Sequence, residues 1–463
     1  MNINDANKLT YNGIRAFARM ERQGIRIDMK RAEKKYAKLA KLIDKLSIKF
    51  TETKFYKHWM GSIGGKKPNV NSNAQLSSFL YKVKKVKPIK LTKKFRKGST
   101  DEEALEALRI PELDDLLRIR KLKKLRDTYL KGFMNEAVNG YIHPSFNLHL
   151  VTTYRSSSDS PNFQNIPVRD EEAKEMIRSC LFPRPGHQLL EFDYSGIEVS
   201  IAACYHNDPT MIKYIKNKYD MHQDMAKQIF QFGEEFDKKE ETFKKLRYSA
   251  KNGFVFPQFY GDYFKNNAAS ISRITKLPMK GRYSDGDGLK LQGGMFLGEH
   301  LKSKGIKSVR SFEVHLKEIE YDFWNNRFPV YNDWRNRWYN KYRKNGYFDT
   351  LTGFRCTGVF DRNFVINAPV QGSAFHCLLW SLIKLDKIFR KKKLDSKLIG
   401  QVHDSIVFDV APDELDYVLE ITQKVTCKDL LKAWDWIIVP LQVEAELCKV
   451  NESWYHKEEI ELI

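Results

Sequence analysis

Two short apolar segments, about 210 residues apart, each carry an aspartate where the chain is expected to form a buried strand. The first is QLLEFDY at 188–194, with Asp193 near its end, and the second is IGQVHDSIVFDV at 399–410, with Asp404 after VH. Both segments are rich in apolar and β-branched residues and show the alternation of a strand, so we predict two strands. A carboxylate in an apolar strand is costly to bury unless it is paired or binds a cation. Two such strands side by side would bring both carboxylates to one metal cluster, whereas either aspartate alone could equally be a strand-end turn residue.

The net charge indicates which substrate such a cluster would meet. The chain of 463 residues has a formal charge of +22, from 80 Lys and Arg against 58 Asp and Glu. This surplus favours a polyanionic partner, because neutralised phosphates release their counterions; a merely lysine-rich soluble protein is the alternative. Two divalent ions about 4 Å apart can assist in-line displacement at phosphorus, and Mg²⁺ suits this work because it prefers hard oxygen ligands.

Most of the remaining chain is expected to be helical. Residues 1–60 predict helix with one break at QGIRID (23–28), and Leu113–Phe133 predicts a helix with one apolar and one cationic face. Between them, Lys82–Lys97 carries nine Lys or Arg and no acid. That run is either a solvated loop or a contact with the backbone of a duplex. The glycine-rich stretch 281–294 lacks the glutamate of a calcium loop and is expected to be an ordinary loop.

The sequence favours a soluble protein without a membrane partner. No apolar run approaches the ~20 residues that a membrane span needs, and the N-terminus lacks a signal-peptide layout. The six cysteines are widely spaced without a CxxC pair, which predicts reduced thiols: Cys180, Cys204, Cys356, Cys377, Cys427 and Cys448. We therefore expect a cytoplasmic protein, in a bacterium or an infected host cell.

Five ordered segments resemble the DNA polymerase I family, family A. DYSGIEVSIAA at 193–203 is similar to the first palm motif of the family, normally DYSQIELR, and QVHDSIVFDV at 401–410 is similar to its last, normally VHDE. The most specific stretch, at 152–187, contains SSSDSPNFQNIP, which fits the family pattern SSxxPNxQNIP. GYFDTLTGFR at 346–355 and NAPVQGSA at 367–374 complete the set. FARMERQGIRID at 17–28, STDEEAL at 99–105 and KLRDTYL at 124–130 match the start of the polymerase region and the thumb.

The resemblance implies an α+β right-hand fold, with a palm on an antiparallel sheet, helical fingers and a helical thumb. It assigns 1–30 to the start of the palm region, 31–150 to the thumb, 151–200 to the palm with the first metal-binding motif, 201–355 to the fingers and 356–463 to the palm with the second. Because the resemblance begins almost at Met1, no exonuclease domain is expected. Proofreading would come from another chain or from a region removed from this one. The short form and altered motifs are phage-like.

The implied activity is that of a DNA-directed DNA polymerase, a nucleotidyltransferase of DNA replication. The chain would act as a monomer on primer-template DNA and dNTPs, adding nucleotides to the primer 3′ end with release of pyrophosphate. A separate exonuclease or processivity factor could accompany it. Two Mg²⁺ ions, or Mn²⁺ in their place, would be held by Asp193, Asp404 and the carbonyl of Tyr194. The catalytic side chains would be Asp193, Asp404, Arg247 and Lys251.

Further residues are assigned by the same motifs. Glu198 would narrow the pocket at the 2′ position of the sugar and exclude ribonucleotides. Arg247 and Lys251, four residues apart on one helix face, would hold the triphosphate together with His222 and offset the charge on the leaving group. The residues expected at the primer terminus and the minor groove are Arg155, Asn367, Gln371 and His403.

The spacing of residues in the helix of the fingers that carries Arg247, Lys251 and Tyr260, called the fingers helix below, departs from that of the family. The family places its two aromatic residues four and eight positions after the lysine, whereas Phe256 and Tyr260 follow Lys251 by five and nine. One extra residue turns an ideal helix by about 100°. A π-bulge could absorb it, helped by Pro257, which cannot donate a helical hydrogen bond. We therefore predict that Phe256 packs beside the sugar and Tyr260 at the templating end; Val255 and Phe259 are the strict-register alternatives.

Two further departures affect the metal site and leave other functions open. Ser405 replaces the glutamate that usually follows the second aspartate, which predicts retained activity with a shifted metal requirement, measurable by magnesium titration. Gly196 replaces the usual glutamine. A reverse transcriptase-like or RNA-making polymerase is the alternative enzyme, and an inactive DNA-binding accessory protein is the alternative of another class.

Overall fold

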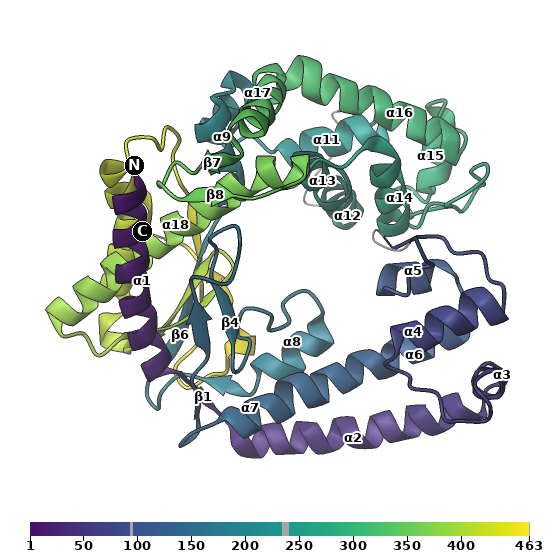
Figure 1. Cartoon of the computed structure of the whole chain (residues 1–463), viewed down its shortest axis with the longest axis horizontal. Helices are drawn as coiled ribbons and strands as arrows, with labels where there is room; N and C mark the ends of the chain where they lie inside the picture. The colour runs from purple at the N-terminus through teal and green to yellow at the C-terminus, as the bar shows by residue number, and fades with distance from the viewer. Residues whose placement is uncertain (93–95, 234–239, 463) are drawn as a thin grey trace.

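A computed structural model describes residues 1–92, 96–233 and 240–462 of the chain (Figure 1). Its centre is a five-stranded antiparallel sheet in the order β12-β11-β6-β10-β9. The strands are β6 (Gln188–Tyr194), β9 (Lys397–Val402), β10 (Ser405–Val410), β11 (Val443–Leu447) and β12 (Glu458–Ile460). Strand β6 has the bounds that the sequence predicts, and it lies next to β10, so the expected side-by-side arrangement is confirmed.

The prediction of one strand over residues 399–410 is wrong in one respect. The run 399–410 is divided between β9 and β10, and Asp404 lies in the two-residue connection rather than within a strand. His403 takes a φ of 52° in this connection, which allows the chain to reverse. Val402 and Ser405 pair across the turn, and Ser405 pairs with Asp193 on the other side. The turn therefore places Asp404 beside the end of β6.

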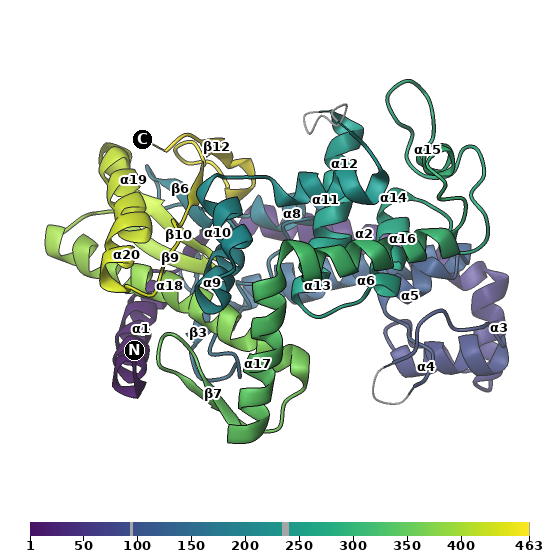
Figure 2. The ribbon, with the colours of Figure 1, turned by 90° about the horizontal axis from the view of Figure 1, so that it is seen from above.

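Helices cover the sheet and bury its apolar face in the largest core cluster. Tyr194 anchors β6 there, since its hydroxyl lies 3.0 Å from Ser381 Oγ on the long helix α18. Figure 2 shows α19 and α20 beside α18. The elements around the sheet are α1 (Ile3–Gln23), α8 (Glu171–Arg178), β5 (Leu181–Phe182), α9 (Ile197–His206), α18 (Arg362–Lys392), η5 (Pro412–Glu414), α19 (Leu415–Lys424), η6 (Val425–Asp429), α20 (Leu430–Ala433) and η7 (Trp454–His456).

The first helical region follows α1 and encloses a separate core around Trp59 and Phe79. The predicted break in residues 1–60 is β1 (Ile25–Ile27). Most of the basic run Lys82–Lys97 follows η1 and is exposed where the structure describes it, while Lys93 and Lys94 lie outside the described residues. The elements are α2 (Met29–Glu52), α3 (Lys54–Ser62), α4 (Asn73–Ser77), η1 (Ser78–Val83), α5 (Glu102–Ala107), α6 (Pro111–Lys123), η2 (Lys124–Leu130), α7 (Lys131–Glu136), β2 (Tyr141–Ile142), β3 (Ser145–Asn147) and β4 (Ser157–Asp159).

The second helical region lies between the two halves of the sheet in sequence and faces the first region across the molecule (Figure 1). Arg273 on α14 and Glu103 on α5 join the two regions through an ion pair of 3.1 Å. Its elements are α10 (Pro209–Lys216), α11 (Met221–Phe230), α12 (Glu241–Ala250), η3 (Lys251–Val255), α13 (Phe256–Phe259), α14 (Phe264–Thr275), α15 (Leu297–Ser303), α16 (Val309–Asp322), η4 (Phe323–Arg327), α17 (Pro329–Asn345), β7 (Tyr347–Asp349) and β8 (Arg355–Thr357).

The architecture agrees with the sequence in its broad plan. An antiparallel sheet flanked by two helical regions confirms the predicted α+β class. Residues 281–294 form no helix or strand, so they are a loop as expected. All six cysteines are free thiols. Among the helices of the described residues, we find none with the length and apolar character that crossing a bilayer demands.

Candidate active site

The two predicted metal-binding aspartates lie at one corner of the sheet. Asp193 is near the end of β6, and the backbone N–H of Tyr194 donates to the Asp404 carbonyl at 3.2 Å. Removal from water and the negative charges of Asp404, Glu191 and Glu444 raise the pKa of Asp193 to about 7, although the residue remains exposed. Burial likewise raises the pKa of Asp404 to about 6, against the opposing effect of Arg155. Each carboxylate therefore lies in surroundings that disfavour its charge.

This donor set fits a hard divalent cation. Two carboxylates and the Tyr194 carbonyl offer only oxygen, as Mg²⁺ and Mn²⁺ prefer. Within the described residues, Asp193 makes no side-chain hydrogen bond or ion pair, and Asp404 lies 3.9 Å from Arg155. No cluster of three or more His, Cys, Asp or Glu side chains with metal-binding geometry occurs in that part of the chain. The candidate set is thus two side chains and one carbonyl.

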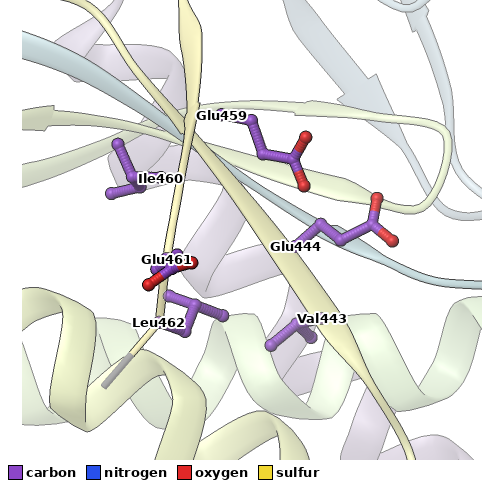
Figure 3. A pocket seen from close by; sticks show the side chains of 6 residues that line it. All are labelled: Val443, Glu444, Glu459, Ile460, Glu461 and Leu462. Carbon is purple, nitrogen blue, oxygen red and sulfur yellow. The ribbon is translucent and has the colours of Figure 1, made fainter.

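A pocket of about 550 Å³ adds acidic surroundings to the same corner. It lies between β11 and β12 and is lined by Val443, Glu444, Glu459, Ile460, Glu461 and Leu462 (Figure 3). Glu444 pairs in register with Asp193, and Figure 3 shows the Glu459 side chain beside it. Unlike the aspartates, these glutamates were not identified from the sequence.

Four of the predicted residues form one polar network beside the aspartates. The Tyr260 hydroxyl donates to Glu198 at 2.5 Å, and Arg155 lies 3.4 Å from the other Glu198 oxygen. Arg155 also lies within ion-pair distance of Asp404, and Asn367 donates to the Tyr260 carbonyl at 3.3 Å. Burial, followed by the nearby Glu198 carboxylate, raises the pKa of Tyr260. The network places Glu198 between the fingers helix and the sheet.

The fingers helix contains the predicted π-bulge. Residues Lys251–Val255 form the π-helix η3, in which the Phe256 N–H donates to the Lys251 carbonyl. The bulge returns Phe256 to the face of Lys251, whose ammonium lies 5.2 Å from the ring centroid. Val255 is fully buried, and Phe259 packs against Trp324 and its neighbours. The strict-register alternatives therefore face the core.

The triphosphate candidates gather on this helix face. The His222 ring meets Phe256 edge-on at 5.5 Å, and its buried Nδ1 has no hydrogen-bond partner among the residues that the structure describes. Burial and the charges of Lys251 and Arg247 lower the pKa of His222 to about 4. Burial also lowers the pKa of Lys251, with Arg247 as the next cause. Arg247 pairs with Asp220 at 2.8 Å, a partner that was not predicted although Asp220 lies only two residues before His222.

The remaining candidates lie nearby without joining these contacts. Gln371 follows Asn367 by one turn of α18, and His403 adjoins Asp404 in the turn after β9. Burial and the charges of Arg155 and Arg169 lower the pKa of His403. Gly196 has a φ of 64° at the start of α9, a left-handed conformation that explains glycine at this position.

The raised pKa of Asp193 predicts how the metal-free protein responds to pH. Because its folded-state value of about 7 exceeds the ordinary 3.8, the folded chain binds more protons than the unfolded chain between these values. Protonation of Asp193 therefore stabilises the folded chain. Its contribution to the free energy of unfolding is fully present below about pH 4 and is lost as pH rises through about 7. Thermal unfolding in EDTA should therefore show a steeper fall in Tm between pH 5 and 7.5 (roughly the titration range) for the wild type than for Asp193→Asn. Equal slopes would contradict the raised pKa.

The chain is similar to known proteins over most of its length. The model of DNA polymerase family A matches residues 36–275 and 317–456. DNA polymerase I of Geobacillus stearothermophilus is 26% identical over 445 residues, which are 95% of this chain and 44% of that protein. DNA polymerase I of Caldicellulosiruptor bescii is 29% identical over 443 residues, or 94% of this chain and 45% of that protein. The chain thus spans less than half the length of these relatives.

A solved structure supports the fold directly. The POL domain of Pol1 from M. smegmatis, in complex with DNA primer-template and dNTP, matches 96% of this chain and 70% of its own, with a TM-score of 0.73 and 25% identity. This likeness confirms the predicted right-hand fold.

Proposed function

Because the chain belongs to DNA polymerase family A, we propose that it is a template-directed DNA polymerase that adds dNTPs to a primer 3′ end and releases pyrophosphate. The observation that carries the proposal is the π-bulge of η3, which brings Phe256 beside Lys251, while Tyr260 bonds to Glu198 in the network that reaches Asp404 through Arg155. The complex of the M. smegmatis domain with primer-template and dNTP supports the same partners for this chain.

We assign the ion-binding role to the corner of the sheet. Asp193, Asp404 and the Tyr194 carbonyl would hold two Mg²⁺ ions, or Mn²⁺ in their place. Bound there, the ions would supply activation of the attacking hydroxyl and stabilisation of the leaving oxygen. Arg155 lies beside Asp404 and would orient that carboxylate toward the primer terminus.

The fingers helix would bind the nucleotide. Lys251 and the His222 Nδ1, which finds no partner in the described part of the chain, would contact the triphosphate, with Arg247 held in place by Asp220. Their positive charge would offset the charge that develops on pyrophosphate. Phe256 would pack beside the sugar, and Tyr260 would close the templating end. Asn367, Gln371 and His403 would contact the primer-template, where minor-groove contacts read the shape of a correct pair.

We also propose the division of the chain stated above into palm, thumb and fingers, and synthesis without proofreading by residues 1–463. Nucleotide release from a mismatched primer end tests the latter.

The Glu198 carboxylate is expected to exclude ribonucleotides. Replacing it with alanine opens space at the 2′ position, so the preference for dNTP over rNTP in kcat/KM should fall on the order of 100-fold. Single-nucleotide incorporation with matched dNTP and rNTP measures this preference. Glu198→Gln keeps the volume and a partner for Tyr260, so it should retain most of the preference. An alanine variant with unchanged preference would exclude this role.

A further inference from the structure

Glu191 is a buried carboxylate on the strand that carries Asp193. Two residues apart on β6, the two side chains point to the same face of the sheet. Ser405 Oγ donates to one Glu191 oxygen at 3.0 Å. Trp454 Nε1 and Lys457 Nζ donate to the other, at 3.0 and 2.7 Å. Neither the proposed reaction nor the family motifs require a charge at this position.

Two cations make this carboxylate necessary. The Arg178 side chain is 0% exposed and lies 3.6 Å from Glu191, and the Lys457 side chain is 7% exposed. Arg178 stacks on Trp454 at 4.0 Å, and Lys457 also contacts Glu446. Buried charges interact strongly because little water screens them. Without Glu191, Glu446 alone would face the two cations, and more positive charge would act on Asp193.

Ser405 links the same carboxylate to the second aspartate. It follows Asp404 directly and pairs in register with Asp193. Its hydrogen bond to Glu191 therefore ties β10 to β6 where the two aspartates meet. The serine that replaces the usual glutamate of the motif thus contacts a carboxylate on the neighbouring strand.

We propose that Glu191 is a positioning residue that sets the affinity of the Asp193–Asp404 pair for divalent cations. It offsets part of the positive charge of Arg178 and Lys457 next to Asp193, and through Ser405 it fixes the turn that carries Asp404. The proposal rests on the proposed function, since it requires cations to bind at these aspartates.

Mn²⁺ binding to the full chain without DNA tests this role, with free Mn²⁺ measured by electron paramagnetic resonance. Glu191→Gln should raise the Kd on the order of 10- to 100-fold, the usual cost of removing an outer-shell partner. Lys457→Met should act in the opposite direction and lower the Kd severalfold, because it removes the cation and keeps Glu191. The double variant, which restores the wild-type net charge of Glu191, Arg178 and Lys457 taken together, should return toward the wild-type Kd.

The opposite signs separate this role from a structural one. If Glu191 only stabilises the fold, both single variants lower Tm, and the Kd does not rise in one variant and fall in the other. That result overturns the proposal. Should Glu191→Gln fail to fold, Lys457→Met still gives the direction in which the Kd changes, and the double variant shows whether that change is reversed.

Asp409→Asn is the matched control. Like Glu191, Asp409 is a buried carboxylate paired with a cation, here Arg184 at 3.0 Å. It lies near the end of β10 that is farthest from Ser405. It should lower Tm without changing the Kd; a change equal to that of Glu191→Gln would count against the proposal. Wild-type Mn²⁺ binding and primer extension, measured in parallel, test the proposed function separately. If both are present and the variants share the wild-type Kd, only the role of Glu191 fails.

Discussion

Replacement of Asp193 with alanine is expected to reduce the rate of nucleotide addition on the order of 10³- to 10⁴-fold, because metal-assisted charge stabilisation contributes several kcal/mol to such reactions. Within the described residues its side chain makes no hydrogen bond or ion pair, so the variant should fold normally. Primer-template binding, which depends on surface cations elsewhere, should change little. Single-turnover extension with saturating dNTP measures the rate.

The matched control is Asp409→Asn, which alters a buried aspartate of the same sheet far from the site. It should extend primers at near the wild-type rate at a temperature where it is folded. An Asp193→Ala variant with more than about a tenth of wild-type activity would exclude a metal-binding role, given the size of the expected contribution.

Lys251→Ala is expected to reduce kcat/KM for dNTP on the order of 10²- to 10³-fold, the usual loss when one preorganised charge at the reacting group is removed. Lys251 is half-buried against Phe256, and neighbouring cations disfavour its charge until a polyanion arrives. The triphosphate should therefore interact with it more strongly than with a surface lysine.

Lys245→Ala on the same helix is the control, since Lys245 is exposed and pairs with Glu241 at 3.1 Å. It should leave kcat/KM within about twofold, as expected for a surface ion pair. Equal losses in the two variants would show that Lys251 contributes only general positive charge.

Local sequence rules predicted the elements with strong periodicity. The segment QLLEFDY predicted β6, because apolar residues that alternate with polar ones at 190–194 favour an extended strand, although the strand is buried on both faces over 188–192. The π-bulge of η3 could be predicted because an extra residue had to be absorbed and Pro257 weakens helical bonding nearby. The β9–β10 turn was missed because its left-handed residue is His403, not the glycine or asparagine that signals such turns.

The missing parts of the candidate site depend on contacts between distant segments. Asp220 pairs with Arg247 across 27 residues of sequence, and Lys457 meets Glu191 across 266. No local pattern encodes such distances. One signal was available: the cost of burying charge applies to Glu191 as much as to Asp193, since both interrupt the same apolar run.

Single-nucleotide addition to a defined primer-template tests the central claim most directly. The wild type with Mg²⁺ should add only the dNTP complementary to the templating base and release one pyrophosphate per addition, and Asp404→Ala should add none at a measurable rate. Wild-type addition that ignores the template base, absence of addition with either Mg²⁺ or Mn²⁺, or undiminished addition by Asp404→Ala would contradict it.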